Sequence, residues 1–205
     1  MNASGRTRVV VLLSGAGTTS APLFEAARDP HFPAEVVAVG ADRADAGGLA
    51  LAAEAELPAF VVEPGEFPDR GAWNVALADQ VAEWQPDLIC CVGFMRILAP
   101  EFVNRFAPRI LNSHPSLLPA FPGAHAVADT LAYGVKVTGA TIHVMDTGVD
   151  TGPIVAQRAV IVRPDDDEAQ LHERIKQVER RMLVEVVADL ATIGWRVDGR
   201  KVWIP

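Results

Sequence analysis

The stretch VVVLLSGAGTTS, residues 9–20, decides the fold that we expect for this chain. Its first five residues, Val9 to Leu13, are all apolar, which is typical of a strand buried on both faces of a parallel sheet. The glycines and hydroxyl residues that follow predict a tight turn, and Ser20 to Arg28 predict a helix. A buried strand, a turn and a helix in this order begin a βαβ unit.

Outward from this stretch, strand patterns and helix patterns continue to alternate at short spacing. In the first half we expect strands at 34–40, 59–62 and 87–92, and helices at 47–55, at 71–84 and after residue 100. In the second half we expect a helix at 126–133, strands at 137–144 and 154–162, a long helix at 168–193 and a hairpin around 198–199.

The two strands of the second half are expected to differ from those of the first. The segment 137–144 alternates Val, Gly, Thr and His with Ala, Ile and Val, which predicts one exposed face. The connection to 154–162 is short enough for antiparallel pairing. The predicted fold class is therefore α/β. We expect a Rossmann-like, mostly parallel twisted sheet with helices on both faces, extended by antiparallel C-terminal strands and a long C-terminal helix.

Length and composition are those of a globular protein. With 205 residues, of which 50% are hydrophobic, the chain can bury a core as a single domain, 1–205, without disulfide or metal staples. No apolar run approaches the roughly 20 residues of a membrane helix. The run from Val9 to Leu13 is too short for a signal-peptide core, so we expect a cytoplasmic protein with no membrane partner.

The net charge indicates which partners are disfavoured, and the cysteine content indicates whether disulfide bonds are expected. The net charge of −8 disfavours a nucleic-acid partner, because Lys and Arg contacts to phosphate supply most of that affinity. Cys90 and Cys91 are the two cysteines, and they are neighbours in an apolar run. Alternation along a strand points them to opposite faces, so we expect two buried thiols rather than a disulfide.

The glycine-containing turn has the chemistry of an anion site. Glycines let the backbone approach an anion, and the start of the following helix supplies free N–H groups. Gly15 and Gly17 follow a strand, and Asp42 follows the next strand, where a dinucleotide fold carries its ribose-binding acid. Ser20 stands where the third small residue of that motif belongs, so the match is incomplete. We expect phosphate binding here, with a purely structural turn as the alternative.

A second stretch, Leu111 to Asp150, carries the candidate catalytic groups. Asn112 and His114 are two residues apart where an apolar run ends, so on a strand both side chains project from the same face. Pro115 then ends strand pairing, and further prolines stiffen the following loop. An imidazolium and an amide N–H pointing together can donate to an oxyanion, and a nearby carboxylate such as Asp150 favours the charged imidazole. This trio suits acyl or formyl transfer.

Three other interpretations concern this second stretch and its histidines. A hydrolytic triad would need an activated serine, but Ser116 follows a proline without the strained turn that activates one. A zinc site from His114, His125 and His143 is conceivable, although their spacing matches no metal motif. We expect His125 to stabilise the loop and His143 to be packed or to face solvent.

The motifs of the chain together resemble one family. They are Ser14 to Gly17, Gly93 to Leu98, Leu111 to Pro119, Phe121 to Gly123, and Asp146 to Pro153. In this combination the chain resembles the glycinamide ribonucleotide formyltransferases, which are folate-dependent enzymes of purine synthesis. The run Asn-x-His-Pro-Ser-Leu-Leu-Pro with a later Asp is shared across folate formyltransferases. Phe-Met-Arg-Ile-Leu and the glycine loop are typical of the glycinamide ribonucleotide branch, and the resemblance covers nearly the whole chain.

The resemblance implies a role for each matching residue. It makes Asn112, His114 and Asp150 the catalytic trio. The positions that hold phosphoribosyl glycinamide in the family correspond to Gly17, Thr18, Thr19, Lys176 and Glu179. The positions that hold folate correspond to Arg70, Phe94, Met95, Arg96, Ile97, Leu98, Asn112, Asp146, Thr147, Gly148, Val149 and Asp150. Without the resemblance, an ordinary ion pair across one helical turn would explain Lys176 and Glu179.

The reaction implied by the resemblance uses two small-molecule substrates and no metal. The formyl group of 10-formyltetrahydrofolate passes to the amine of glycinamide ribonucleotide, giving formylglycinamide ribonucleotide and tetrahydrofolate in de novo purine biosynthesis. A nucleotide-binding half, about 8–108, would adjoin a folate and catalytic half, about 109–205, in a monomer or homodimer. The family's loop often reads Gly-Asn-Gly-Ser-Asn. Here Ala16, Thr18 and Thr19 replace the polar trio, and the cationic Lys176 can compensate for the lost amides.

Three rival functions would use similar sequence features. A 10-formyltetrahydrofolate hydrolase would use the same trio with water as the acceptor, but such proteins usually carry an extra N-terminal regulatory domain. A methionyl-tRNA formyltransferase would need a tRNA-binding appendage and a basic surface, which the net charge of −8 does not support. A non-catalytic nucleotide-binding module would leave the Asn, His and Asp unexplained.

Overall fold

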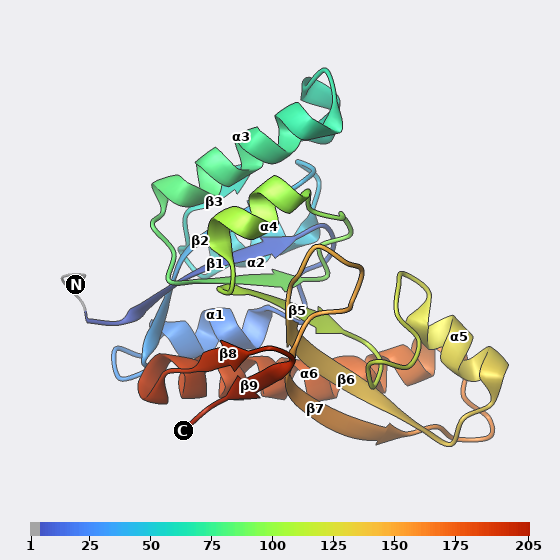
Figure 1. Cartoon of the computed structure of the whole chain (residues 1–205). Coiled ribbons are helices and arrows are strands. Elements are labelled where there is room, and N and C mark those ends of the chain that lie inside the picture. The colour runs from blue at the N-terminus through green and yellow to red at the C-terminus, as the bar shows by residue number, and fades with distance from the viewer. Residues whose placement is uncertain (1–4) are drawn as a thin grey trace.

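Strands and helices alternate along the polypeptide in the order that the sequence predicts (Figure 1). The computed structural model describes residues 5–205, so the first four residues of the predicted domain 1–205 lie outside the described residues. The strands are β1 Thr7–Leu13, β2 Ala34–Ala41, β3 Ala59–Val61, β4 Leu88–Val92, β5 Ile110–His114, β6 Val137–Val144, β7 Ile154–Ile161, β8 Arg196–Asp198 and β9 Lys201–Trp203. The helices are α1 Ala21–Arg28, α2 Gly47–Glu54, the 3-10 turn η1 Pro64–Glu66, α3 Arg70–Glu83, α4 Pro100–Phe106, α5 Ala126–Tyr133 and α6 Glu168–Ile193.

One sheet joins all the strands of the described chain, in the order β3-β2-β1-β4-β5-β6-β7-β9-β8. The strands from β3 to β5 are parallel, and β6 and β7 continue the sheet in antiparallel pairing. The C-terminal hairpin of β8 and β9 is also present, and it joins β7 through the pair Ile154 and Lys201. The predicted parallel sheet with an antiparallel extension is thus confirmed.

Helices cover both faces of the sheet. Helices α3 and α4 lie on one face, and α1 and α6 lie on the other (Figure 1). Alternation within β4 divides the two cysteines between these layers: Cys90 packs with the α1 and α6 side, and Cys91 with the α3 and α4 side. Burial raises the pKa of Cys90 to about 12, so this thiol stays protonated and unreactive at neutral pH. Both thiols are free and buried, as the sequence predicts.

Local signals place the ends of the two C-terminal helices where the sequence predicts them. Helix α5 ends at Gly134, whose φ of 80° lies in the left-handed region that favours glycine. Helix α6 begins at Asp167, which accepts a hydrogen bond from the N–H of Gln170, and the Gln170 side chain returns one to the Asp167 N–H. This reciprocal cap contributes about 1 kcal/mol to helix stability.

The prediction of a half-exposed strand at 137–144 is wrong. Every residue of β6 after Val137 is buried. Helix α6 covers one face, and the proline-containing loop after β5 covers the other. The Thr141 hydroxyl donates to Ser116 O at 2.7 Å and accepts from Leu118 N–H at 3.1 Å, so this polar residue is satisfied inside the core. Burial by a loop from elsewhere in the chain leaves no periodic pattern in the sequence of the strand itself. The alternation of residue types in 137–144 therefore predicted an exposed face that β6 does not have.

In residues 5–205, none of the helices is long and apolar enough to span a membrane.

Candidate active site

Strand β5 presents Asn112 and His114 on one face of the sheet, where they meet Asp150 from the loop between β6 and β7. Asn112 Nδ2 lies 3.4 Å from Asp150 Oδ1, and His114 Nδ1 lies 3.4 Å from Asp150 Oδ2. His114 is buried, with 4% of its surface exposed. The predicted trio is therefore brought together. Both distances are long for hydrogen bonds, so the three side chains are close neighbours rather than tightly bonded partners.

Asp150 is held in place by its backbone and by the opposite loop. Its φ of 53° is unusual for a residue other than glycine, and Gly123 N–H donates to its Oδ2 at 2.7 Å. Burial alone would raise the pKa of this carboxyl. The neighbouring His143 ring, the hydrogen bond from the Gly123 N–H and the charge of His114 outweigh burial, so the pKa lies below its usual value. Asp150 is therefore a carboxylate at neutral pH.

His143 is the member of this cluster that the sequence analysis missed. It is 2% exposed, and its Nε2 lies 3.1 Å from Asn112 Nδ2 and 3.5 Å from Asp150 Oδ1. Its Nδ1 lies 3.1 Å from the carbonyl of Val144, which can only accept. In the neutral ring, Nδ1 therefore carries the proton and Nε2 accepts from Asn112. The antiparallel register of β5 and β6 pairs Asn112 with His143, so a prediction of this register would have identified His143.

The loop after β5 orients the His114 ring. His114 Nε2 lies 2.8 Å from Phe121 O, an acceptor, so Nε2 carries a proton and Nδ1 is the nitrogen that faces Asp150. Phe121 in turn makes an edge contact with the ring of Tyr133 on α5. The Ser116 hydroxyl donates to Ala120 O at 2.5 Å, so this buried serine braces the loop and offers no free nucleophile.

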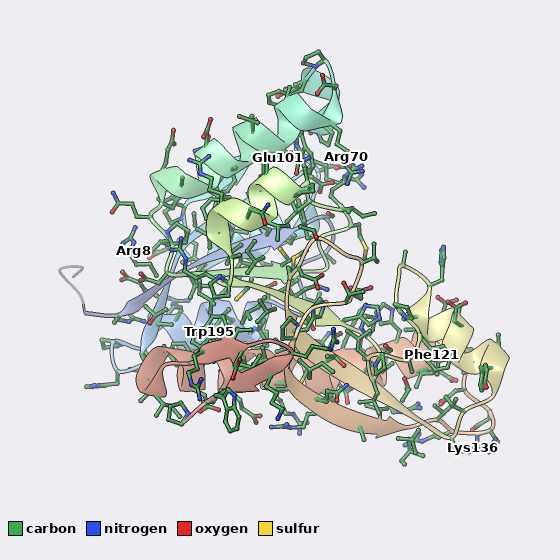
Figure 2. All side chains as sticks on the ribbon, in the orientation of Figure 1. Arg8, Arg70, Glu101, Phe121, Lys136 and Trp195 are labelled. Atoms are coloured by element: carbon green, nitrogen blue, oxygen red, sulfur yellow. The ribbon has the colours of Figure 1, made fainter. Side chains whose placement is uncertain are left out.

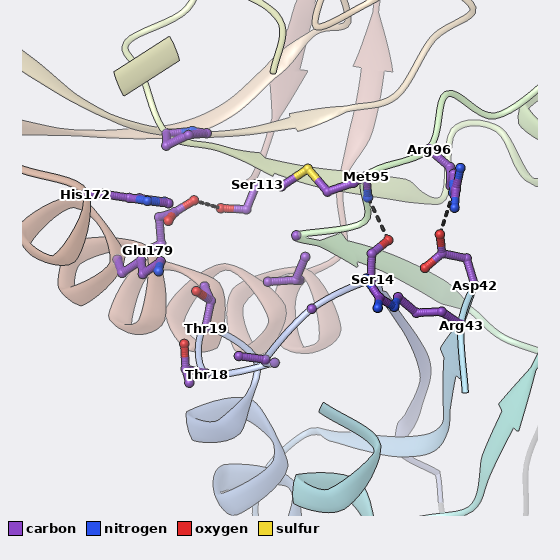
Figure 3. A pocket seen from close by; sticks show the side chains of 17 residues that line it. Ser14, Thr18, Thr19, Asp42, Arg43, Met95, Arg96, Ser113, His172 and Glu179 are labelled. Carbon is purple, nitrogen blue, oxygen red and sulfur yellow. Dashed lines mark hydrogen bonds and ion pairs between the residues drawn. The ribbon is translucent and has the colours of Figure 1, made fainter. Parts of the chain in front are cut away.

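A cavity of about 490 Å³ opens at the carboxyl ends of the parallel strands β1, β2, β4 and β5 (Figure 3). In open α/β sheets this edge is the usual ligand position. The glycine loop after β1 forms one side, with Gly17 at φ 70°, and a Cβ there would lie 2.5 Å from Gly48 Cα. The predicted substrate residues line this one cavity, namely Gly17, Thr18, Thr19, Lys176 and Glu179.

Helix α6 contributes three polar side chains to the cavity. Burial raises the pKa of Glu179, against the Ser113 hydrogen bond and the charges of Lys176 and Arg180. Burial, followed by the charge of Lys176, lowers the pKa of His172. A neutral imidazole and an ammonium group thus lie one helical turn apart, opposite the glycine loop. Ser113 and His172 were not singled out from the sequence, because a strand serine and a helix histidine carry no local signal.

Arg96 belongs to the predicted folate segment, but its side chain turns into this cavity. It forms an ion pair with Asp42, which is 3% exposed at the end of β2 (Figure 3). Asp42 thus lies in the cavity wall, as its place after β2 suggested. One of its oxygens accepts from Arg96, and the other is buried without a hydrogen-bond partner among residues 5–205. The pair links the β2 end to the loop after β4.

The rest of the predicted folate segment divides between core and surface. Phe94 and Leu98 are buried in the core, and Phe94 stacks on Trp73 with the ring centroids 6.5 Å apart. Their side chains therefore hold the segment in place. Met95 and Ile97 are exposed, at 71% and 57%. Arg70 lies at the start of α3 (Figure 2). Its side chain donates to the carbonyl of Ile97.

The facing loop, Asp146 to Asp150, adjoins this segment. Met145, just before the loop, packs against the same core cluster as Phe94 and Leu98. Asp146 Oδ1 accepts from Gly148 N–H at 3.0 Å and from the Thr151 hydroxyl at 2.6 Å, so this carboxylate shapes the loop. Thr147, Gly148 and Val149 are exposed at its tip.

The histidines considered for a zinc site do not converge. His114 and His143 meet at Asp150, whereas His125 is exposed at the start of α5 and makes no capping hydrogen bond there. Within residues 5–205, no group of three or more His, Cys, Asp or Glu side chains could hold a metal ion.

Comparison with known proteins agrees with this arrangement. A family model described as formyl transferase matches residues 7–187. The phosphoribosylglycinamide formyltransferase of Mycobacterium tuberculosis is 55% identical over 197 residues, which cover 96% of this chain and 91% of that protein. The chain belongs to the phosphoribosylglycinamide formyltransferases, within the formyl transferase family. The sequence prediction of a formyl transfer enzyme of purine biosynthesis is therefore confirmed at the level of the family.

Two further members of this family show how widely the fold is shared. The crystal structure of glycinamide ribonucleotide transformylase 1 from Symbiobacterium toebii superposes with a TM-score of 0.94 at 39% identity, covering 99% of this chain and 95% of that one. A trifunctional purine biosynthetic protein of Drosophila melanogaster is 40% identical over 201 residues. That match covers 95% of this chain and 15% of the larger protein.

Proposed function

We propose that this chain transfers the formyl group of 10-formyltetrahydrofolate to the amine of glycinamide ribonucleotide, in de novo purine biosynthesis. One observation carries the proposal: the buried cluster of Asn112, His114 and Asp150 adjoins a cavity suited to a phosphate, across the single strand β5. A site for the reacting carbonyl and a site for a nucleotide therefore lie side by side. The relatives named above support the same reaction.

The nucleotide would bind in the cavity at the carboxyl ends of the strands. Backbone N–H groups of Gly17 to Thr19, at the start of α1, would hold the phosphate together with Lys176. The Glu179 carboxylate would accept from the ribose hydroxyls or from the glycinamide end. This half of the site supports the assignment of about 8–108 to nucleotide binding, with α6 adding groups from the C-terminal half.

The folate would bind between Met95 to Leu98 and the Asp146 loop. Backbone groups of this segment and the exposed side chains of Met95, Ile97 and Val149 can contact a flat heterocycle, while buried Phe94 and Leu98 hold the backbone still. Arg70, whose side chain donates to the Ile97 carbonyl, would bind the acidic benzoylglutamate portion. Residues of about 109–205 complete this site.

The reaction needs donors for an oxyanion and a route for one proton. The amine nitrogen attacks the formyl carbon, and the carbonyl electrons move to oxygen, where Asn112 Nδ2 and protonated His114 Nδ1 donate. When the intermediate collapses, the N10–carbon bond breaks and the electron pair returns to N10. Asp150, a carboxylate at neutral pH, would carry the proton from the amine to N10 through a water.

The test is a spectroscopic assay of folate release with purified protein. With 10-formyltetrahydrofolate and glycinamide ribonucleotide together, we expect release of tetrahydrofolate and formylation of the nucleotide in equal amounts. Release at the same rate without the nucleotide would identify a hydrolase instead. Nucleotide binding with no release would identify a non-catalytic binding module. We place the reaction in the cytoplasm, where the substrates are free in solution.

A further inference from the structure

Strand β5 has two chemically different faces. Asn112 and His114 project toward the cluster with Asp150, whereas Ser113, between them, projects to the opposite face. On that face Leu111 packs in the core cluster that contains the buried residues of α6. Ser113 itself lies in the wall of the nucleotide cavity (Figure 3).

The Ser113 hydroxyl donates to Glu179 Oε1 at 2.6 Å. Glu179 is 5% exposed, so its carboxylate has lost most of its water. Among residues 5–205, Ser113 is the one group that hydrogen-bonds this carboxylate. A buried carboxylate with a single fixed donor has its orientation determined by that donor. The remaining oxygen, Oε2, is then left to accept from a ligand.

We propose that Ser113 is a positioning residue for the nucleotide substrate, which orients the Glu179 side chain toward the cavity. Strand β5 would then contribute to the chemistry with one face and to nucleotide recognition with the other. The inference rests on the nucleotide site of the proposed function. It predicts that removing one hydroxyl weakens nucleotide binding while leaving the formyl-transfer step almost intact.

Electrostatics around Glu179 give the proposal a second observable. Burial raises the pKa of Glu179, while the Ser113 hydrogen bond and the charges of Lys176 and Arg180 oppose that rise. His172 is the other titratable group that α6 presents to this cavity, and Arg43, Arg96 and Asp42 face it from the opposite wall. Loss of the Ser113 donor therefore raises the pKa of Glu179 further. As the pH is lowered, nucleotide binding by Ser113→Ala should therefore begin to weaken at a higher pH than binding by the wild type.

The experiment measures the Kd of glycinamide ribonucleotide by calorimetry from pH 5 to pH 9, for the wild type, Ser113→Ala and Ser113→Thr. Formyl transfer at saturating nucleotide is measured in parallel. Thr192→Val is the matched control. Thr192 lies at an exposed position of α6, the helix that also carries Glu179, and its hydroxyl donates to Ala188 O. Ser113→Ala is also made in a Glu179→Ala background, in which the side chain that Ser113 would orient is absent.

We expect Ser113→Ala to raise Kd on the order of tenfold, as for loss of a hydrogen bond to a charged group. The acid limb of binding should move to higher pH, kcat should change less than threefold, and Ser113→Thr should restore both Kd and the pH profile. Unchanged Kd and pH profile in Ser113→Ala would overturn the proposal. So would an equal effect of Ser113→Ala in the Glu179→Ala background, or a loss of binding explained by lower thermal stability. Wild-type binding without formyl transfer would refute the proposed function and still test this inference.

Discussion

The cavity proposed for the nucleotide and the cluster of Asn112, His114 and Asp150 lie on opposite faces of β5 and are built in different ways. The cavity forms at the carboxyl ends of parallel strands, where a local strand-turn-helix unit supplies the glycine loop. The cluster depends on antiparallel pairing, because Asn112 meets residues 31 and 38 positions further along the chain. A site built from a local motif can be predicted from the sequence, whereas a site built by strand register can be identified only once the fold is known. Substitutions in the two regions should also affect different kinetic parameters.

The largest effect is expected from Asn112→Ala in the catalytic cluster. Loss of one oxyanion donor should lower kcat about 10²- to 10³-fold, with KM for the nucleotide nearly unchanged. Steady-state formyl transfer with both substrates varied measures this. Asn104→Ala, on an exposed position of α4, is the matched control. If Asn112→Ala kept its kcat and instead lost nucleotide affinity, the division between the two regions would be wrong.

The next effect belongs to the cavity. Lys176→Met should raise KM for the nucleotide about 10- to 100-fold, because a charge-assisted contact to phosphate is lost, while kcat stays within a few-fold. The same assay at increasing nucleotide concentration separates the two parameters. The exposed Lys136→Met should leave both unchanged. A fall in kcat at saturating nucleotide would show that Lys176 takes part in the chemistry.

A smaller effect is expected from His143, which accepts from Asn112. His143→Leu should lower kcat about tenfold, because the buried amide loses its acceptor and its orientation. His143→Gln offers a carbonyl oxygen in place of Nε2 and should retain more activity. Measurement of kcat for both variants, with the exposed His125→Leu as control, tests this. Equal activity of His143→Leu and the wild type would remove His143 from the cluster.

The smallest effect concerns stability and pH. The folded-state pKa of Asp150 lies below its unfolded value of 3.8, so the ionised carboxyl stabilises the fold above that value. This contribution is lost as the pH falls through the lowered pKa. Urea unfolding should therefore show Asp150→Asn less stable than the wild type at pH 7, with the difference shrinking toward pH 3. A difference that is independent of pH would mean that charge at Asp150 does not contribute.

Much of the fold was predictable because its signals are local. The boundaries of α5 and α6 agree with the prediction, since a left-handed glycine at 134 and a reciprocal cap at Asp167 end and begin them. The split of Cys90 and Cys91 between two cores follows from alternation alone. The burial of β6 was missed, because the loop that covers it comes from residues 20 or more positions earlier.

In the candidate site, as in the fold, the features that depend on local signals were predictable and those that depend on long-range contacts were not. Strand alternation and donor chemistry predicted the trio of Asn112, His114 and Asp150, the family motifs supported it, and the structure brings these three residues together. Their roles stay predictions. His143 was set aside because a histidine on a strand carries no local signal. The resemblance assigned Arg96 to the folate segment, and the structure adds that its side chain pairs with Asp42 in the wall of the cavity proposed for the nucleotide.

The sequence by itself determined the order of strands and helices, the anion-suited glycine loop and the pairing of an amide with an imidazole on one strand face, because each depends on residues within a few positions of one another. The tertiary structure alone decided which side chains complete these features. The register of β5 and β6 brought His143 to Asn112, and the packing of α6 brought Glu179 to Ser113. Contacts of this kind form only when distant segments are buried together, so their residues leave no pattern along the chain.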